Sequence, residues 1–249
     1  MSRRAFFVAI AVFALIGGRL LVNHGIRDFG AVPSSTVGIV FAASGGHATA
    51  VASGARAARN FETPETVDGV NDIDPHKAFG SKSAPIVMEI FSDYQCPACR
   101  QLYETTNRLL MDNYVSTGKV FLIHRDFPLP MHAYSRIAAR YARAAAEIGK
   151  IEPVEQALFD NQEKWEQTGD VDGTIAAVLT PAEMSRVRAL VKGGTLEPLI
   201  NKDYELGQMY RVNQTPTTVF HCKGQTYPYA GVMSYEILSQ FLNQLLSQR

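Results

Sequence analysis

The chain has 249 residues, of which 46% are hydrophobic and 10% aromatic; this composition excludes a disordered protein and suffices for one large or two small domains. Lys+Arg and Asp+Glu number 24 each, so net charge gives no reason to expect nucleic acid or an acidic membrane surface as a partner. Three cysteines are too few for a secreted domain held together by disulfides, and they fit one functional pair plus one further thiol.

The N-terminus has the pattern of a targeting segment. Arg3 and Arg4 precede an apolar run over residues 5–16, which is typical of a signal peptide. With its short extension the run is borderline for a membrane anchor, which needs about 20 apolar residues. We therefore expect residues 1–29 to be a signal peptide or N-terminal anchor that directs export. The alternatives are a misassigned start or a buried helix.

Two segments follow the targeting region. Residues 30–73 are rich in Ala, Gly, Ser and Thr at first and then polar, which is typical of a linker and a lead-in segment. Residues 74–249 have the periodic patterns of a globular domain.

The domain begins with a strand, a helix and a second strand. Residues 85–91 are apolar and rich in β-branched side chains, which indicates a buried strand. Residues 97–114 have apolar positions at helical spacing, and residues 119–127 read as the second strand. This order predicts a βαβ unit with parallel strands and a right-handed crossover.

A helical block and a second sheet-forming unit complete the domain. Residues from about 131 to 210 are predicted to be helical almost throughout. The expected helices cover 134–148, 154–165, 180–191 and 197–210. Arg136, Arg140 and Arg143 lie at helical spacing in the first of these, which predicts a solvated face or a surface for a partner.

The C-terminal segment predicts an antiparallel hairpin of residues 217–222 and 226–230, joined by a short turn that contains glycine, and then an amphipathic helix over 234–247. The predicted fold class is therefore α/β: a thioredoxin fold with a helical cap domain inserted between a βαβ unit and a ββα unit.

Cys96 and Cys99 lie where the first strand meets the first helix. A helix N-terminus presents unpaired N–H groups and the positive end of the helix dipole, and both favour a thiolate. Because the thiolate is the nucleophile of disulfide exchange, this junction is suited to that chemistry.

Three motifs give the chain a family resemblance. They are Phe91-Ser92-Asp93-Tyr94-Gln95-Cys96-Pro97-Ala98-Cys99, Arg125-Asp126-Phe127-Pro128-Leu129 and Val212-Asn213-Gln214-Thr215-Pro216-Thr217. In order, spacing and helical insertion the chain resembles the DsbA-like branch of the thioredoxin superfamily over residues 74–249. A lone Cys-x-x-Cys is weak evidence, but together with the later Thr-Pro-Thr it is strong.

The resemblance implies a role for each matching residue. Cys96 would be the attacking thiolate and Cys99 the more buried resolving thiol. Pro97 would stiffen the first helical turn, where it has no N–H to lose. Pro216 would be a cis-proline facing the pair, and Thr215 would offer backbone groups to an extended substrate.

The resemblance also implies a role for a buried acid, and one residue departs from the pattern. Glu89 would lie behind the pair as a proton acceptor, with its pKa raised by burial. Its alternative is an edge or solvent-facing strand residue. Ala98 replaces the histidine that donates to the thiolate in strongly oxidising relatives, which predicts a less oxidising pair.

The third cysteine allows alternatives. Cys222 and His221 could complete a zinc site with the Cys96–Cys99 pair, but there is no second Cys-x-x-Cys and no spaced histidine pair, so we expect no metal site. Cys222 is predicted to be a small buried hydrophobe, with a regulatory thiol as the alternative.

The resemblance predicts an exported, monomeric thiol:disulfide oxidoreductase without a cofactor, acting as an oxidase on cysteine-containing exported polypeptides. Its own disulfide would be regenerated by a DsbB-like or vitamin K epoxide reductase-like membrane partner. Two alternatives stay open: a disulfide isomerase or reductase that a membrane partner keeps reduced, and a redox-inert binding or assembly factor.

Overall fold

A computed structural model describes residue 70 and residues 72–247 of the chain. The expected signal peptide or anchor (1–29), and the linker and lead-in segment (30–73) apart from residues 70, 72 and 73, lie outside these residues. No helix within the described part is both long enough and apolar enough to span a bilayer.

The described part is built on a five-stranded sheet with the strand order β1-β3-β2-β4-β5. The strands are β1 (Ala78–Phe79), β2 (Ile86–Ser92), β3 (Val120–Asp126), β4 (Thr217–Cys222) and β5 (Gln225–Ala230). β2 and β3 are parallel, whereas β4 pairs antiparallel with both β2 and β5. The predicted βαβ unit and hairpin are therefore confirmed; the short edge strand β1 was not predicted.

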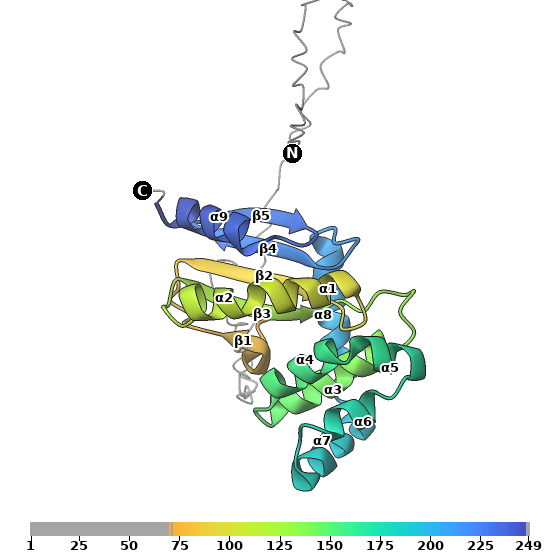
Figure 1. The fold of residues 1–249 in the computed structure, drawn as a ribbon. Coiled ribbons are helices and arrows are strands. Elements are labelled where there is room, and N and C mark those ends of the chain that lie inside the picture. The colour runs from red at the N-terminus through yellow and green to blue at the C-terminus, as the bar shows by residue number, and fades with distance from the viewer. Residues whose placement is uncertain (1–69, 71, 248–249) are drawn as a thin grey trace, which may run out of the picture. The chain divides into compact units, whose positions relative to one another are not determined.

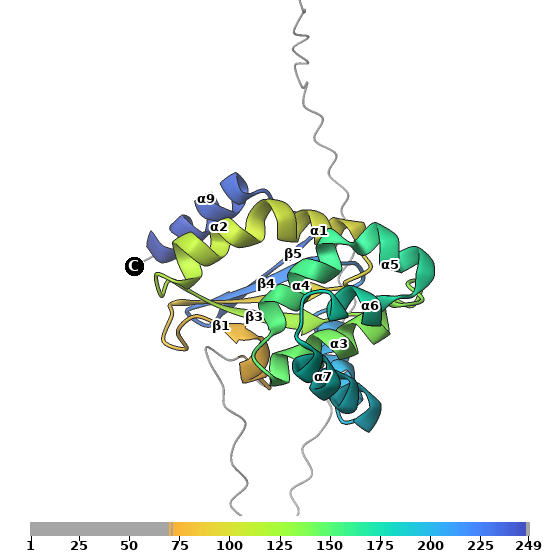
Figure 2. The ribbon, with the colours of Figure 1, turned by 60° about the horizontal axis from the view of Figure 1, so that its bottom comes forward.

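Helices cover both faces of this sheet (Figures 1 and 2). α1 (Pro97–Leu102) continues through a π-helical stretch (Tyr103–Asn107) into α2 (Arg108–Leu110) and a second π-helical stretch (Met111–Val115), as one connected helical segment. With α9 (Tyr235–Ser247) it covers one face, where Met88 and Ile90 pack in a common core with Leu242. α8 (Glu197–Met209) lies on the other face, where Tyr204 stacks on Phe127.

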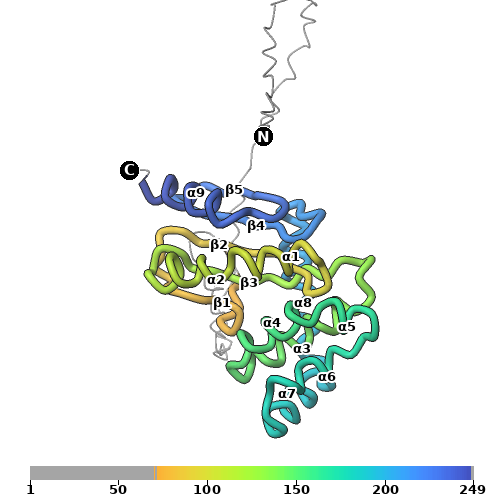
Figure 3. The backbone as a smooth tube through the Cα atoms, in the orientation of Figure 1, coloured from red at the N-terminus to blue at the C-terminus, as the bar shows by residue number. Residues whose placement is uncertain are grey.

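The helical cap is inserted between β3 and β4, as the tube in Figure 3 shows. Its helices before α8 are α3 (Ser135–Glu147), α4 (Ile151–Asp160), α5 (Gln162–Thr168), α6 (Val171–Ala176) and α7 (Pro181–Gly193). The predicted fold class, a thioredoxin fold with an inserted cap, is confirmed.

The cap differs from the prediction at two places. The helix predicted over 154–165 is broken at Asn161, which ends α4 with its side chain bonded to the Ala157 carbonyl, and Gln162 begins α5. α6 was not predicted. Asp170 caps it by accepting the Gly173 N–H at 2.8 Å, and a Cβ atom at Gly173 would clash with that carboxylate.

A buried ionic cluster joins the cap to the sheet. Arg143 of α3 is 2% exposed, bonds Asp126 of β3 at 2.5 Å and also contacts Asp203 of α8. Asp203 in turn accepts from Arg125 at 3.0 Å. The solvated face predicted for α3 is therefore wrong at Arg143, because helical periodicity does not reveal a buried partner on another element.

Candidate active site

The two cysteines lie at the start of α1, on the side that faces the cap. Cys96 is the N-cap residue, in extended conformation, and Pro97 is the first helical residue. The Cys96 carbonyl accepts the Cys99 and Arg100 N–H groups at 3.0 and 3.2 Å, which closes the first turn. Cys96 is 7% exposed and Cys99 is 2% exposed, and both pack in the core of the cap.

The segment before β4 contacts the first cysteine. The Cys96 thiol donates to the Thr215 carbonyl, with an Sγ–O distance of 3.3 Å, across 119 positions of sequence. The Thr215–Pro216 peptide bond is cis. Within the described part, the Thr215 hydroxyl is buried and makes no hydrogen bond, so it is available to donate to the sulfur when the thiol loses its proton.

The two thiols differ sharply in acidity. A hydrogen bond from Cys99 lowers the pKa of Cys96 to about 5; burial opposes this shift, while Thr215 and the backbone N–H groups of Cys99 and Ala98 add to it. Burial, and then the neighbouring Cys96 sulfur, raise the pKa of Cys99 well above its ordinary value. The arrangement therefore gives one thiolate at neutral pH and keeps the second group a thiol.

Asp93 organises the turn that precedes the cysteines. Its N–H donates to Cys99 Sγ at 3.4 Å, and its carbonyl accepts from Cys96 N at 3.0 Å. Its buried carboxylate accepts from Leu129 N at 2.8 Å and pairs with His132 Nδ1 at 2.7 Å. Burial raises the pKa of Asp93, although these bonds oppose the shift. Sequence reasoning missed Asp93; its place next to the Cys-x-x-Cys motif was the available signal.

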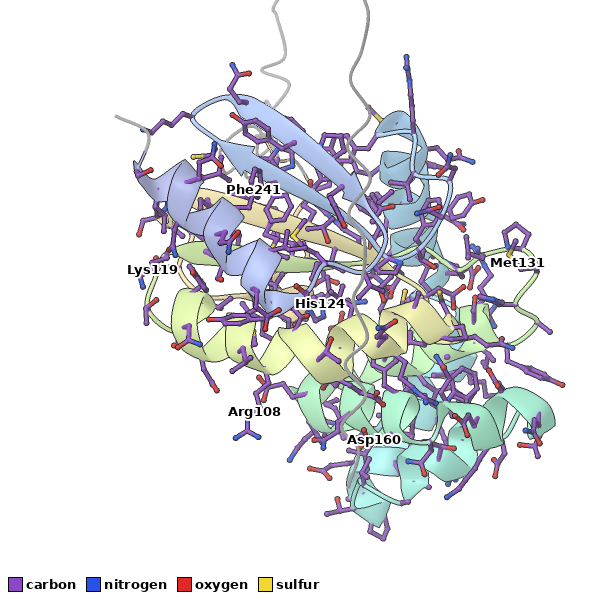
Figure 4. The ribbon with its side chains drawn as sticks, turned by 45° about the horizontal axis from the view of Figure 1, so that its top comes forward. Arg108, Lys119, His124, Met131, Asp160 and Phe241 are labelled. Atoms are coloured by element: carbon purple, nitrogen blue, oxygen red, sulfur yellow. The ribbon has the colours of Figure 1, made fainter. Side chains whose placement is uncertain are left out.

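A cavity of about 30 Å³ lies behind Cys99, large enough for one water molecule. The residues that line it include Lys77, His124, Arg125, Asp126 and Glu155. Glu155 of α4 accepts from the Tyr94 hydroxyl at 2.7 Å and pairs with His124 at 3.0 Å. Burial acts to raise the pKa of Glu155, but His124, Lys77 and Tyr94 together outweigh burial. The pKa therefore lies below its ordinary value, and the carboxyl is ionised at neutral pH. Figure 4 shows His124 between the sheet and the helical segment after Cys99.

Glu89 does not have the predicted surroundings. Its neighbours in β2, Met88 and Ile90, belong to the core under α1 and α9, so by strand alternation the Glu89 side chain lies on the opposite face. There it binds Arg125 at 2.7 Å and His221 at 2.9 Å. Burial acts to raise the pKa of Glu89, but His221 and Arg125 together outweigh burial, so the pKa lies below its ordinary value. The predicted raised pKa is wrong, and Glu155 is the buried glutamate that lines the cavity at Cys99.

The remaining candidates lie elsewhere. Cys222 is buried in the core with Phe220 and Leu242, and the His221 side chain is hydrogen-bonded to Glu89. In the part of the chain that the structure describes, no group of three His, Cys, Asp or Glu side chains is arranged to hold a metal ion. Cys222 and His221 thus pack with residues other than Cys96 and Cys99.

Comparisons with known proteins agree with this fold. A family model described as thioredoxin matches residues 73–243. Disulfide bond formation protein D of Bacillus subtilis is 25% identical over 162 residues, which cover 61% of this chain and 71% of that protein. The crystal structure of Wolbachia pipientis alpha-DsbA1 superposes with a TM-score of 0.59 at 16% identity, over 72% of this chain and 96% of that one.

A longer protein also contains a similar region. Na(+)/H(+) antiporter NhaA 3 of Salinispora tropica is 26% identical over 184 residues, or 72% of this chain. The chain spans only 27% of the antiporter's length.

Proposed function

The chain belongs to the thioredoxin family and has the fold of DsbA-like proteins, and from that premise we propose that it is a thiol:disulfide oxidoreductase that works through Cys96 and Cys99. The single observation that carries this proposal is the placement of the pair: Cys96 is the N-cap residue of α1 with its Sγ 3.3 Å from the Thr215 carbonyl, and Cys99 is buried in the first turn of the same helix. A low thiol pKa makes Cys96 the thiolate of the pair at neutral pH and the better leaving group.

The proposed reaction is an oxidation of substrate thiols. A substrate thiolate attacks Cys96 Sγ of the Cys96–Cys99 disulfide, which forms a mixed disulfide and releases Cys99 as a thiolate that takes up a proton. A second substrate thiolate then attacks the substrate sulfur of the mixed disulfide and displaces Cys96 as a thiolate. The substrate gains one disulfide, and the enzyme is left as a dithiol.

Local geometry supports this order of events. The hydrogen bond from Cys96 Sγ to the Thr215 carbonyl brings the segment before β4 against the sulfur that the substrate attacks. An extended substrate could add its backbone to the groups of Thr215. Ala98 contributes its N–H but no side-chain donor, which limits how far the thiolate is stabilised.

We extend the proposal to the cellular setting predicted from the sequence. The substrates are cysteine-containing exported polypeptides, and a DsbB-like or vitamin K epoxide reductase-like membrane protein reoxidises the pair. The chain acts as a monomer, exported through its N-terminal segment. Similarity to a protein named for disulfide bond formation supports this setting.

Trapping of the mixed disulfide tests the assignment of the two sulfurs. With Cys99→Ser, Cys96 should accumulate as a mixed disulfide with a peptide that contains an activated disulfide, because no resolving thiol remains. With Cys96→Ser, the buried Cys99 should react at least tenfold more slowly. Equal trapping at both positions would contradict the assignment.

A second candidate is an isomerase or reductase that its partner keeps reduced. It is favoured by the presence of Ala98, which offers no side-chain donor to the thiolate and so predicts a less oxidising pair. The reduction potential separates the two functions. The reduction potential of thioredoxin is about −270 mV. If the protein is an oxidase, equilibration with glutathione should give a reduction potential well above that value. A value near that of thioredoxin would favour the second candidate.

A further inference from the structure

A glutamine of the cap binds the backbone of the active-site turn. Gln162 is the first residue of α5 and is 1% exposed. Its side-chain Nε2 donates to the Tyr94 carbonyl at 2.7 Å and to the Cys96 carbonyl at 3.1 Å. The cap thus contacts the nucleophilic residue itself, through a buried group that carries no charge and does not titrate.

The break between α4 and α5 gives Gln162 this position. A continuous helix over 154–165 would make Gln162 an interior residue of that helix, whereas here Asn161 ends α4 and Gln162 starts a new element. Since both hydrogens of a side-chain amide can donate, one glutamine can hold two carbonyls at once.

The Cys96 carbonyl holds the turn whose backbone N–H groups face the Cys96 sulfur. It accepts the Cys99 and Arg100 N–H groups, so its orientation fixes the first turn of α1. The N–H groups of Ala98 and Cys99 in that turn stabilise the Cys96 thiolate. Because residue 98 has no polar side chain, the Cys99 thiol is the side-chain donor of this turn, and the remaining donors are backbone N–H groups whose directions depend on the backbone.

We propose that Gln162 is a positioning residue for the exchange reaction: by holding the Tyr94 and Cys96 carbonyls it fixes the first turn of α1, and so sets the acidity of Cys96 and the reduction potential of the Cys96–Cys99 pair. The inference rests on the proposed function and deepens it. It makes the cap part of the redox machinery in addition to its contribution to the core.

Two substitutions of similar length test this role, with one matched control. Gln162→Met removes both donors, and Gln162→Glu places a carboxylate opposite two carbonyl oxygens. Gln156→Met makes the same change at an exposed position of α4. The readout is the pH dependence of Cys96 alkylation in the reduced protein, followed by mass spectrometry at a temperature below the melting transition of every variant.

We expect Gln162→Met to raise the alkylation midpoint by up to about one pH unit, the equivalent of a net hydrogen bond. Such a tenfold change in the thiolate equilibrium lowers the reduction potential by about 30 mV. Gln162→Glu should shift the midpoint at least as far, and Gln156→Met should leave it unchanged. If Gln162→Met does not fold, Gln162→Leu carries the test, because it also removes both donors and adds no charge that would shift the thiol pKa directly.

A purely structural role predicts a different result. Gln162→Met would then melt at a lower temperature with unchanged midpoint and potential, and that outcome would overturn the proposal. Alkylation needs no substrate protein, so a shifted midpoint in a protein that transfers no disulfide would refute the proposed function and leave the positioning role intact.

Discussion

Replacing Glu89 by glutamine separates the role implied by family resemblance from the role that the structure gives this residue. Glu89 is fully buried and bridges Arg125 and His221 on the sheet face away from α1. Glu89→Gln keeps the shape of the side chain but removes its charge, so Arg125 loses one of its buried anionic partners. We expect a loss of stability with little change at the cysteines.

The size of the loss follows from the two bonds. Hydrogen bonds to charged groups contribute about 1.5–3 kcal/mol each, and breaking a buried ion pair costs about 3–5 kcal/mol. Because glutamine still offers one acceptor oxygen to Arg125, we expect a decrease of about 3 kcal/mol in the free energy of unfolding. For a domain of this size that corresponds to a melting temperature roughly 6–12 °C lower.

The loss should depend on pH in a defined direction. The pKa of the folded Glu89 carboxyl is depressed below its ordinary value of 4.5, so its contribution to stability is present above that pH. It is lost as the pH falls through the lower, folded-state pKa. The stability difference between wild type and Glu89→Gln should therefore be constant above pH 4.5 and shrink in more acidic solution.

Urea unfolding of both proteins across this pH range is the assay, together with the alkylation profile of Cys96. The matched control is Glu104→Gln, a half-exposed carboxylate paired with Arg100 beside the active site, which should cost at most about 1 kcal/mol. A Glu89→Gln protein as stable as wild type, with a displaced alkylation profile, would refute the structural role and support the proton-acceptor role.

Three further predictions concern the cysteines, the cavity and the cap. Alkylation of Cys96 in the reduced protein should be half-maximal near pH 5, and a midpoint near 8.5 would be inconsistent with the geometry. Because the folded thiol pKa is depressed, reduced protein should lose stability relative to oxidised protein as the pH falls from about 8.5, the usual thiol pKa, to about 5. When the reduced protein reduces an external disulfide, Glu155→Gln should slow the second step, in which Cys99 resolves the mixed disulfide, at least several-fold, while the first step at Cys96 stays fast. Equal slowing of both steps in stopped-flow measurements would argue against a role for Glu155 at the cavity. Thr180→Ala, which removes half of the capping box of α7, should lower the free energy of unfolding by about 1 kcal/mol and leave the reduction potential unchanged, as calorimetry and glutathione equilibration would show.

The sequence predicts the elements that depend on local patterns. Alternating and periodic apolar residues were sufficient for β2, β3, the hairpin and α9, and the Thr180-Pro181 start of α7 was visible as an N-cap followed by a first-turn proline. The Cys-x-x-Cys motif and the Thr-Pro-Thr segment were each recognisable, and their contact at Cys96 and Thr215 followed from the family resemblance.

What the sequence did not predict depends on contacts between distant elements. Glu89 is a carboxylate in an apolar strand whichever face it lies on; only the register with β3 and β4 brings it to Arg125 and His221. Arg143 and Gln162 likewise look like surface residues of amphipathic helices until the cap packs on the sheet and the active-site turn. These polar side chains are buried because their partners come from elsewhere in the chain, and helical or strand periodicity has no information about them.

Transfer of a disulfide in a single turnover tests the proposed function most directly. Oxidised protein is mixed with an equal amount of a reduced, unfolded polypeptide that contains two cysteines, and both are quenched with acid and analysed by mass spectrometry. We predict one disulfide formed in the polypeptide for each Cys96–Cys99 disulfide lost, and no transfer from Cys96→Ser. A polypeptide that stays reduced while the Cys96–Cys99 disulfide persists would contradict the assignment of this chain as a thiol oxidase.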